Sequence, residues 1–154
     1  MKEIIRILLA DDHPLVRKGM ATVITSDPEY SIIAECEDGT HALKDIAEWR
    51  PDIAVLDVNM PDMDGIEVMR QTDRKTCPTK FIMLTMDASP EYVEQALALG
   101  ADGYVLKESA IQELLDCLKA VRSGKKYLSP ALSALIMEWQ SGKKKMSGTI
   151  PGLN

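Results

Sequence analysis

The hydrophobic positions of this chain fall into short apolar runs that alternate with segments of helical periodicity. Five of the runs are rich in branched aliphatic residues and bounded by turn residues, which is typical of strands buried on both faces. These runs cover residues 4–10, 30–36, 53–57, 80–85 and 103–106. Between them, apolar residues recur every three or four positions, which predicts amphipathic helices. The chain therefore reads as strands and helices in strict alternation.

Turn and capping residues mark where the predicted helices begin and end. Pro90 suits the first turn of a helix, and Gly100 and Gly124 suit the position just after one. Ser109 and Gln112 have the spacing of a capping box. The stripes expected to face the sheet are Ala42, Leu43, Ile46 and Trp49 in the second helix, Val93, Ala96 and Leu97 in the fourth, and Ile111, Leu114, Leu115, Leu118 and Val121 in the fifth.

Alternating strands and helices predict an α/β fold: a five-stranded open parallel sheet with helices on both faces. Because crossovers between parallel strands are right-handed, the strand order decides which helices share a face. In such sheets ligands bind beyond the carboxyl ends of the strands. Any functional site is therefore expected at that edge.

The composition changes after Gly124, and we divide the chain there into a domain of residues 1–124 and an appendage of residues 125–154. Ser129 and Pro130 begin another helical pattern, whose apolar stripe comprises Leu132, Leu135, Ile136 and Trp139. This stripe fits either a linker helix that packs on its own domain or a contact with a partner or a second copy. The segment from Ser141 onward is expected to be a flexible tail.

The bulk composition narrows the class of protein. A chain of 154 residues that is 45% hydrophobic and 27% charged is ordinary for one soluble domain with an appendage. Its net charge of −6 argues against nucleic acid as a partner of the whole chain. Three cysteines without a close pair favour reduced thiols, and no apolar stretch approaches the roughly 18 residues of a membrane span. We expect a cytoplasmic protein without membrane contact.

Polar residues stand where four of the predicted strands end. Asp11 and Asp12 follow the first strand, Asp57 closes the third, Thr85 closes the fourth, and Lys107 follows the fifth. In a parallel sheet these side chains meet at one edge. Two carboxylates about 4 Å apart repel by roughly 4 kcal/mol at an effective dielectric of 20, so a cation is expected among them.

The chemistry of this edge favours Mg²⁺ and a phosphoryl group. Hard carboxylate oxygens suit Mg²⁺, whereas zinc prefers clustered His or Cys, which the sequence lacks. We interpret His13 and His41 as surface residues rather than ligands. With the metal bound, Asp57 is placed to attack phosphorus and form an aspartyl phosphate, which Lys107 would stabilise as a point charge.

At these residues the chain resembles the receiver domain of two-component response regulators. The segments 9–13, 57–65 and 100–107 are similar to the NarL/FixJ branch in particular, and the resemblance covers about residues 4–124. It implies a flavodoxin-like strand order, 2-1-3-4-5. The residues that carry the resemblance together are Asp11, Asp12, Asp57, Thr85, Tyr104 and Lys107.

The resemblance also implies a site. A sensor histidine kinase would transfer its phosphoryl group to Asp57. Asp12 and Asp57 would ligate Mg²⁺ directly, together with the backbone carbonyl of Asn59, while Asp11 would act largely through water. Such a domain is a signalling phosphoacceptor rather than an enzyme, apart from self-phosphorylation from a donor and autodephosphorylation.

A switch is implied as well. Thr85 would move toward the phosphoryl group and the ring of Tyr104 would turn inward behind it, which changes the surface of the fourth helix, fifth strand and fifth helix. A partner reads that surface, and family likeness suggests homodimers that form on phosphorylation. Lys107 completes the set of catalytic and switch residues.

Two features depart from the branch. Met86 follows Thr85 where the family usually has a small residue, and its bulk is expected to shield the phosphoryl group. The helix-turn-helix output domain of the branch is absent from this sequence. The sequence is thus interpreted as the receiver of a transcriptional regulator, which would reach DNA only through an output domain, or as a stand-alone receiver that acts through protein contacts.

Two other classes were weighed against this interpretation. A phosphatase of the haloacid dehalogenase type is suggested by Asp57-Val58-Asn59, but its nucleophile follows the first strand of its core. A flavodoxin-like FMN carrier needs a phosphate-binding loop after the first strand, where Asp11 and Asp12 would repel phosphate. Both alternatives fit the positions of the acids less well.

Overall fold

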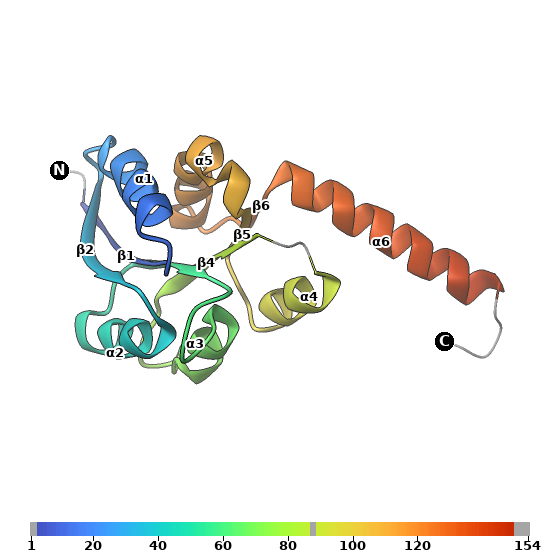
Figure 1. The fold of residues 1–154 in the computed structure, drawn as a ribbon, viewed down its shortest axis with the longest axis horizontal. Coiled ribbons are helices and arrows are strands. Elements are labelled where there is room, and N and C mark those ends of the chain that lie inside the picture. Colours follow the sequence, from blue (N-terminus) through green and yellow to red (C-terminus); the bar gives the residue numbers. More distant parts are fainter. Residues whose placement is uncertain (1–2, 87–88, 150–154) are drawn as a thin grey trace.

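The computed structural model describes residues 3–86 and 89–149, without the side chains of residues 139, 140 and 142–149. In this part of the chain six parallel strands form one sheet in the order β2-β1-β3-β4-β5-β6 (Figure 1). The predicted order of the first five strands is confirmed. The strands are β1 (Ile5–Ala10), β2 (Tyr30–Cys36), β3 (Ile53–Asp57), β4 (Lys80–Thr85), β5 (Gly103–Leu106) and β6 (Tyr127–Leu128).

Helices cover both faces of the sheet, as predicted. Figure 1 shows α1 and α5 on one face and α2, α3 and α4 on the other. Each helix follows the strand before it, so right-handed crossovers account for this division. The helices are α1 (Pro14–Thr25), α2 (Gly39–Trp49), α3 (Gly65–Gln71), α4 (Pro90–Ala98), α5 (Ala110–Arg122) and α6 (Pro130–Thr149), with a short 3₁₀ turn, η1 (Lys107–Ser109), before α5.

The sheet separates two apolar layers, because successive strand residues point to opposite faces. On one face Leu9 and Val55 are buried together with Leu114 and Leu118 of α5. On the other, Leu56 belongs to the layer beneath α2, α3 and α4. The central strand β3 is buried along its whole length and β4 is buried after Lys80, which explains why both read as continuous apolar runs.

The strand β6 was not predicted. Its backbone adds to the edge of the sheet through Tyr127 N–H, which donates to Asp102 O at 2.9 Å, and Ser129 N–H, which donates to Tyr104 O at 2.9 Å. A strand of two residues is too short to show periodicity, and only pairing with β5 creates it.

The helix predicted after Ser129 is present as α6, which leaves the edge of the sheet near β6 and extends away from it (Figure 1). Leu132 is buried against the domain, whereas Leu135 is about half exposed; the side chain of Trp139 lies outside the description. The backbone stays helical to Thr149, through part of the segment expected to be a flexible tail, and residues 150–154 lie outside the described range. Glycine at position 142 lowers the stability of the helix by only about 1 kcal/mol relative to alanine, and the lysines that follow it have high helix propensity, so the helix can continue through this segment.

Three predicted core residues and one predicted cap are wrong. Trp49, Leu97 and Ile111 are each about half exposed, because they lie in the first or last turns of their helices, where the sheet no longer covers them. The capping box at Ser109 does not form: its side chain makes no capping hydrogen bond, since η1 already gives Ser109 a helical backbone. Among the described residues, no helix combines the length and hydrophobicity that crossing a membrane requires.

The three cysteines are expected to resist alkylation until the protein unfolds. All are free and buried. Burial and a hydrogen bond to Asp45 raise the pKa of Cys36 to about 12, and burial also raises the pKa of Cys117, so little reactive thiolate exists near pH 8 in the folded state. Intact mass after treatment with iodoacetamide, with and without urea, checks this. Labelling at equal rates in both conditions would contradict it.

Candidate functional site

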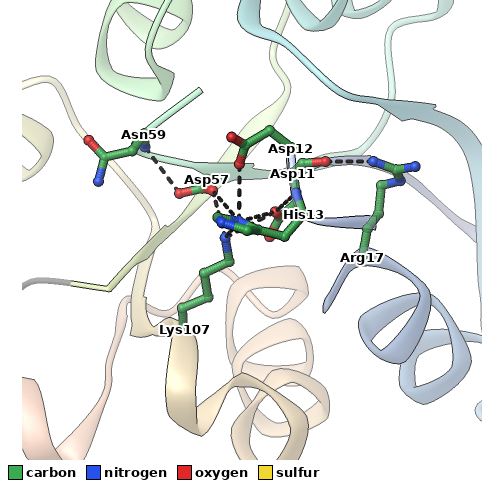
Figure 2. Close-up of polar contacts among 7 residues, drawn as sticks. All are labelled: Asp11, Asp12, His13, Arg17, Asp57, Asn59 and Lys107. Atoms are coloured by element: carbon green, nitrogen blue, oxygen red, sulfur yellow. Dashed lines mark hydrogen bonds and ion pairs between the residues drawn. The ribbon is translucent and has the colours of Figure 1, made fainter. Parts of the chain in front are cut away.

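The carboxyl ends of β1, β3 and β5 bring two acids and a lysine together in the interior. Asp11 follows β1, Asp57 is the last residue of β3, and Lys107 follows β5. The Lys107 ammonium donates to Asp57 Oδ2 at 2.7 Å and to Asp11 Oδ1 at 3.0 Å (Figure 2). All three side chains are almost completely buried. The convergence predicted from the strand ends is therefore present in the structure.

Asp12 and His13 complete a group of four possible metal ligands. Each of Asp11, Asp12, His13 and Asp57 offers one ligand atom, and these atoms lie within 4.8 Å of one another. The prediction that His13 is a surface residue is confirmed, and the prediction that it is not a ligand stays a prediction. Its side chain is half exposed, but Nδ1 lies 3.1 Å from Asp12 Oδ1 and 2.6 Å from Lys107 Nζ.

The backbone explains why His13 reaches the cluster. Asp11 Oδ1 accepts a hydrogen bond from His13 N–H at 2.7 Å, which folds the chain tightly between β1 and α1. His13 then stands at the N-cap of α1. The only signal in the sequence was the position of His13 directly after Asp11-Asp12. A single histidine next to two acids is too common to indicate a role in a site. His41, by contrast, is exposed and pairs with Asp38.

The loop after β3 positions Asp57. Asn59 N–H donates to Asp57 Oδ1 at 3.0 Å, so both carboxylate oxygens are held. Val58 N–H donates to Leu84 O at 2.8 Å, and Gly65 N–H closes the loop onto Val58 O at 2.9 Å. A Cβ at Gly65 would lie 2.5 Å from Asp57 O, so only glycine allows this close approach. The role predicted for the carbonyl of Asn59 as a ligand stays a prediction.

Thr85 lies on β4, which pairs with β3, and Tyr104 lies on β5, which pairs with β4. Thr85 is the buried last residue of β4, and Asp57 pairs with the residue just before it, Leu84. Tyr104 is fully buried in β5, opposite Met83, within the layer that also contains Leu132 of α6. Their predicted switch roles remain predictions.

The cluster contains more negatively charged groups than positively charged ones. Burial raises the pKa of Asp57, although the hydrogen bond and charge of Lys107 oppose the shift. Burial lowers the pKa of Lys107, but hydrogen bonds with Asp57 and Asp11 outweigh it and hold the pKa above its usual value, so the ammonium stays charged. One buried ammonium faces two buried carboxylates and the partly exposed Asp12.

The donor set fits a hard divalent cation. Asp11 is completely buried, and its Oδ2 has no hydrogen-bond partner among the described residues. A buried carboxylate oxygen without a partner is costly, and a cation would satisfy it. Mg²⁺ takes one or two carboxylates and keeps several waters, and the exposed side of Asp12 leaves room for them.

A pocket of about 230 Å³ lies beside the site and is lined by His13, Val16, Met86, Lys107 and Glu108. Met86 is 70% exposed at its rim, where the sequence placed it next to Thr85. The predicted shielding of the phosphoryl group by Met86 stays a prediction.

Comparison with known proteins assigns the family. A family model described as the response regulator receiver domain matches residues 7–119. The transcriptional regulatory protein DegU of Brevibacillus brevis is 33% identical over 137 residues, which cover 88% of this chain and 58% of DegU. The nitrate/nitrite response regulator protein NarL of Escherichia coli K12 is 33% identical over 130 residues, 84% of this chain and 60% of NarL. The chain thus spans about three fifths of the length of these relatives.

Solved structures agree. A two-component response regulator of the LuxR family from Aurantimonas sp. SI85-9A1 superposes with a TM-score of 0.83 at 33% identity and covers 90% of this chain and 99% of that one. The isolated REC domain of RcsB from Salmonella enterica serovar Typhimurium, determined with the phosphomimetic BeF₃⁻, superposes with a TM-score of 0.79 at 28% identity. The match covers 86% of this chain and 99% of that one. The fold and the sequence thus agree on one class: the chain belongs to the response regulator receiver domain family, the phosphoacceptor domains of two-component signalling.

Proposed function

We propose that Asp57 is the phosphoryl acceptor of this receiver domain. The observation that carries the proposal is the buried contact of 2.7 Å between Asp57 Oδ2 and Lys107 Nζ, with Asp11 at the same ammonium. A carboxylate held beside one fixed positive charge, at the edge where ligands of parallel sheets bind, is suited to nucleophilic attack on an anionic donor.

The proposed reaction transfers one phosphoryl group. A carboxylate oxygen of Asp57 attacks phosphorus, the bond from phosphorus to the nitrogen of a kinase phosphohistidine breaks, and the electron pair stays on that imidazole. The product is an acyl phosphate. Lys107 is placed to exchange its contact with the Asp57 carboxylate for contacts with the phosphoryl oxygens, whose negative charge its ammonium would stabilise. Asn59 N–H holds the other oxygen of Asp57. In the proposed autodephosphorylation, water attacks the same phosphorus, the bond from phosphorus to the Asp57 oxygen breaks, and inorganic phosphate leaves while the Asp57 carboxylate is restored.

Asp11, Asp12 and Asp57, with the backbone carbonyl of Asn59, are the residues we propose to hold Mg²⁺. The partnerless buried oxygen of Asp11 supports a cation there. Bound Mg²⁺ supplies charge neutralisation, so that a phosphoryl donor can approach three carboxylates, and it orients the Asp57 oxygen.

Thr85 and Tyr104 are the proposed switch residues. Thr85 ends the strand beside Asp57, and Tyr104 lies on the next strand, in the layer shared with α4 and α6. A charge added at Asp57 would bias these two positions and so change the surface of α4, β5 and α5.

The partners and setting are proposed from the family. A sensor histidine kinase is the donor, and homodimers form on phosphorylation. The relatives that carry regulatory names support a transcriptional regulator that binds DNA through an output domain, with a stand-alone receiver as the alternative. Residues 1–124 are the proposed receiver domain and residues 125–154 its appendage, and the three free thiols support the cytosol.

The wild-type protein is expected to gain one phosphoryl group when incubated with Mg²⁺ and acetyl phosphate, and Asp57→Asn is expected to gain none. Intact mass spectrometry measures both. Asp62→Asn is the matched control, because Asp62 is exposed in the same loop with φ of 69°, a conformation that asparagine adopts readily. An acid-stable adduct that persists in Asp57→Asn, or no adduct in the wild type, would refute the proposal.

A further inference from the structure

The short strand β6 covers the edge of the sheet beside Tyr104. Tyr104 pairs with Leu128 of β6, and paired residues of neighbouring parallel strands point to the same face of the sheet. Leu128 packs against the apolar layer that contains Tyr104. Without β6, β5 would be the edge strand and Tyr104 would lie next to that open edge. The appendage therefore supplies part of the cover of a proposed switch residue.

The first turns of α6 add to the same cover. Leu132 is completely buried in the layer that holds Tyr104, together with Val93 of α4. Ile136, one turn further along α6, is partly buried against this layer, whereas Met137 is 70% exposed. One stripe of α6 is thus part of the core beneath α4.

Two hydroxyl groups fasten the appendage to α5. The Glu113 carboxylate of α5 accepts hydrogen bonds from Tyr127 OH at 2.7 Å and from Ser129 Oγ at 3.0 Å. Ser129 is completely buried, and its N–H donates to Tyr104 O at 2.9 Å. A buried hydroxyl that loses its acceptor destabilises the folded state, so these bonds favour one position for the start of α6.

These contacts join the appendage to the surface that the proposed switch would change. β5 carries Tyr104, α5 carries Glu113, and α4 contributes to the layer that buries Leu132. The ring of Tyr104 is completely buried while α6 is docked, and a buried ring is the position that the proposed switch assigns to the phosphorylated state. Docking of α6 and phosphorylation would then bias the same side chain in the same direction.

We infer that α6 is the intramolecular partner of the switch surface, and that its docking holds Tyr104 in the inward position. This inference rests on the proposed switch and adds the appendage to it. Coupling between two sites is reciprocal, so a phosphoryl group at Asp57 strengthens the docking of α6 as much as docking favours the phosphoryl group. The state of Asp57 is thereby passed to the helix that leads away from the domain (Figure 1).

Calorimetric titration of the full chain with beryllofluoride in saturating Mg²⁺ tests this coupling, because beryllofluoride is a phosphoryl mimic. Coupling between sites typically amounts to about 5- to 150-fold in affinity, so Leu132→Ala is expected to weaken beryllofluoride binding at least about fivefold. Met137→Ala is the matched control, since it shortens an exposed side chain of the same helix and should leave the affinity within about twofold. An affinity of Leu132→Ala within about twofold of wild type would overturn the inference.

Glu113→Ala is a second variant that leaves the apolar layer intact. Alanine favours helix, while Tyr127 and Ser129 both lose their acceptor. This variant is expected to weaken beryllofluoride binding as well, and it decides the test if Leu132→Ala does not fold. Asp116→Ala, which removes an exposed carboxylate from the same helix, is its control. Equal affinities of the Glu113 and Asp116 variants would overturn the inference.

Hydrogen exchange separates the coupling from a general loss of stability. In the wild type, beryllofluoride is expected to slow the exchange of the backbone amides of residues 133–138, because bound beryllofluoride favours docked α6. In Glu113→Ala these amides are expected to exchange faster. A purely structural role of the docking contacts would leave the local opening of α6 in the wild type unchanged by beryllofluoride, and that result would overturn the inference.

The outcome for the inference is distinguishable from that for the proposed function. If Asp57 is phosphorylated and the wild type binds beryllofluoride, but neither Leu132→Ala nor Glu113→Ala changes that affinity, then the role of α6 alone is disproved. If the wild type binds no beryllofluoride and Asp57 gains no phosphoryl group, both proposals fail.

Discussion

Replacement of Gly39 by alanine is expected to lower the free energy of unfolding by about 3 kcal/mol or more, at the upper end of overpacking effects. Gly39 begins α2, and its N–H donates to Pro61 O at 3.4 Å in the loop after β3. A Cβ there would lie 1.8 Å from the backbone oxygen of Met63. Backbone cannot rotate away as a side chain can, so the loop that carries Asn59 must move off α2.

Urea unfolding followed by circular dichroism measures this loss, and Gly19→Ala is the control. Gly19 lies within α1, and its nearest neighbour would be the flexible Cδ1 of Ile111 at 3.3 Å. Alanine stabilises a helix interior by roughly 0.5–1 kcal/mol relative to glycine, so this variant is expected to be neutral or slightly stabilised. Equal unfolding midpoints for the two variants would show that the loop does not pack on α2 as described.

Lys107→Met is expected to destabilise the protein by about 3–5 kcal/mol near neutral pH in the absence of divalent ions, because it leaves buried carboxylates without their counter-charge. Asp11 and Asp57 each lose the ammonium at 3.0 and 2.7 Å. Millimolar Mg²⁺ is expected to restore part of the loss by replacing that charge. Urea unfolding with and without Mg²⁺ measures both effects.

Lys126→Met is the control for Lys107→Met. Lys126 pairs with Asp102 at 3.2 Å, but its side chain is 67% exposed. Exposed pairs contribute about 0–1 kcal/mol, so the variant is expected to unfold close to wild type. A Lys107 variant as stable as the Lys126 variant would show that the buried pair makes no net contribution.

The loss in Lys107→Met is also expected to depend on pH. Burial already raises the pKa of Asp57, and removal of the opposing ammonium raises it further. A carboxyl whose pKa is higher in the folded state than in the unfolded state binds its proton more readily when folded. The stability of the variant should therefore rise as pH falls through the folded pKa toward about 3.9, the unfolded value. A loss that stays constant over this range would contradict the assignment to Asp57.

Much of the fold was predictable because its signals are local. The runs that became β1 to β5 are buried on both faces, so each reads as apolar by itself, and Gly100 and Gly124 take the positive φ of 87° and 83° expected after helices. The wrong predictions concern residues whose burial depends on the elements packed beside them. Trp49 and Leu97 keep the helical period but lie beyond the cover of the sheet.

The candidate site shows the same division. Asp57 and Lys107 could be placed from their strand ends, since parallel strands carry those ends to one edge. His13 could not, because its membership depends on the backbone turn made by Asp11 and on the reach of a lysine 94 residues away. No pattern within a few residues of His13 contains that information.

By itself the sequence determined the order of strands and helices, the edge at which polar side chains gather and the class of chemistry there, because periodicity and residue type act over short distances. Only the tertiary structure decided that β6 pairs with β5, that Asp11 and Asp57 share one buried ammonium, and that His13 joins them. The physical reason is that these contacts join residues far apart in the chain, and their geometry exists only once the sheet has set its register.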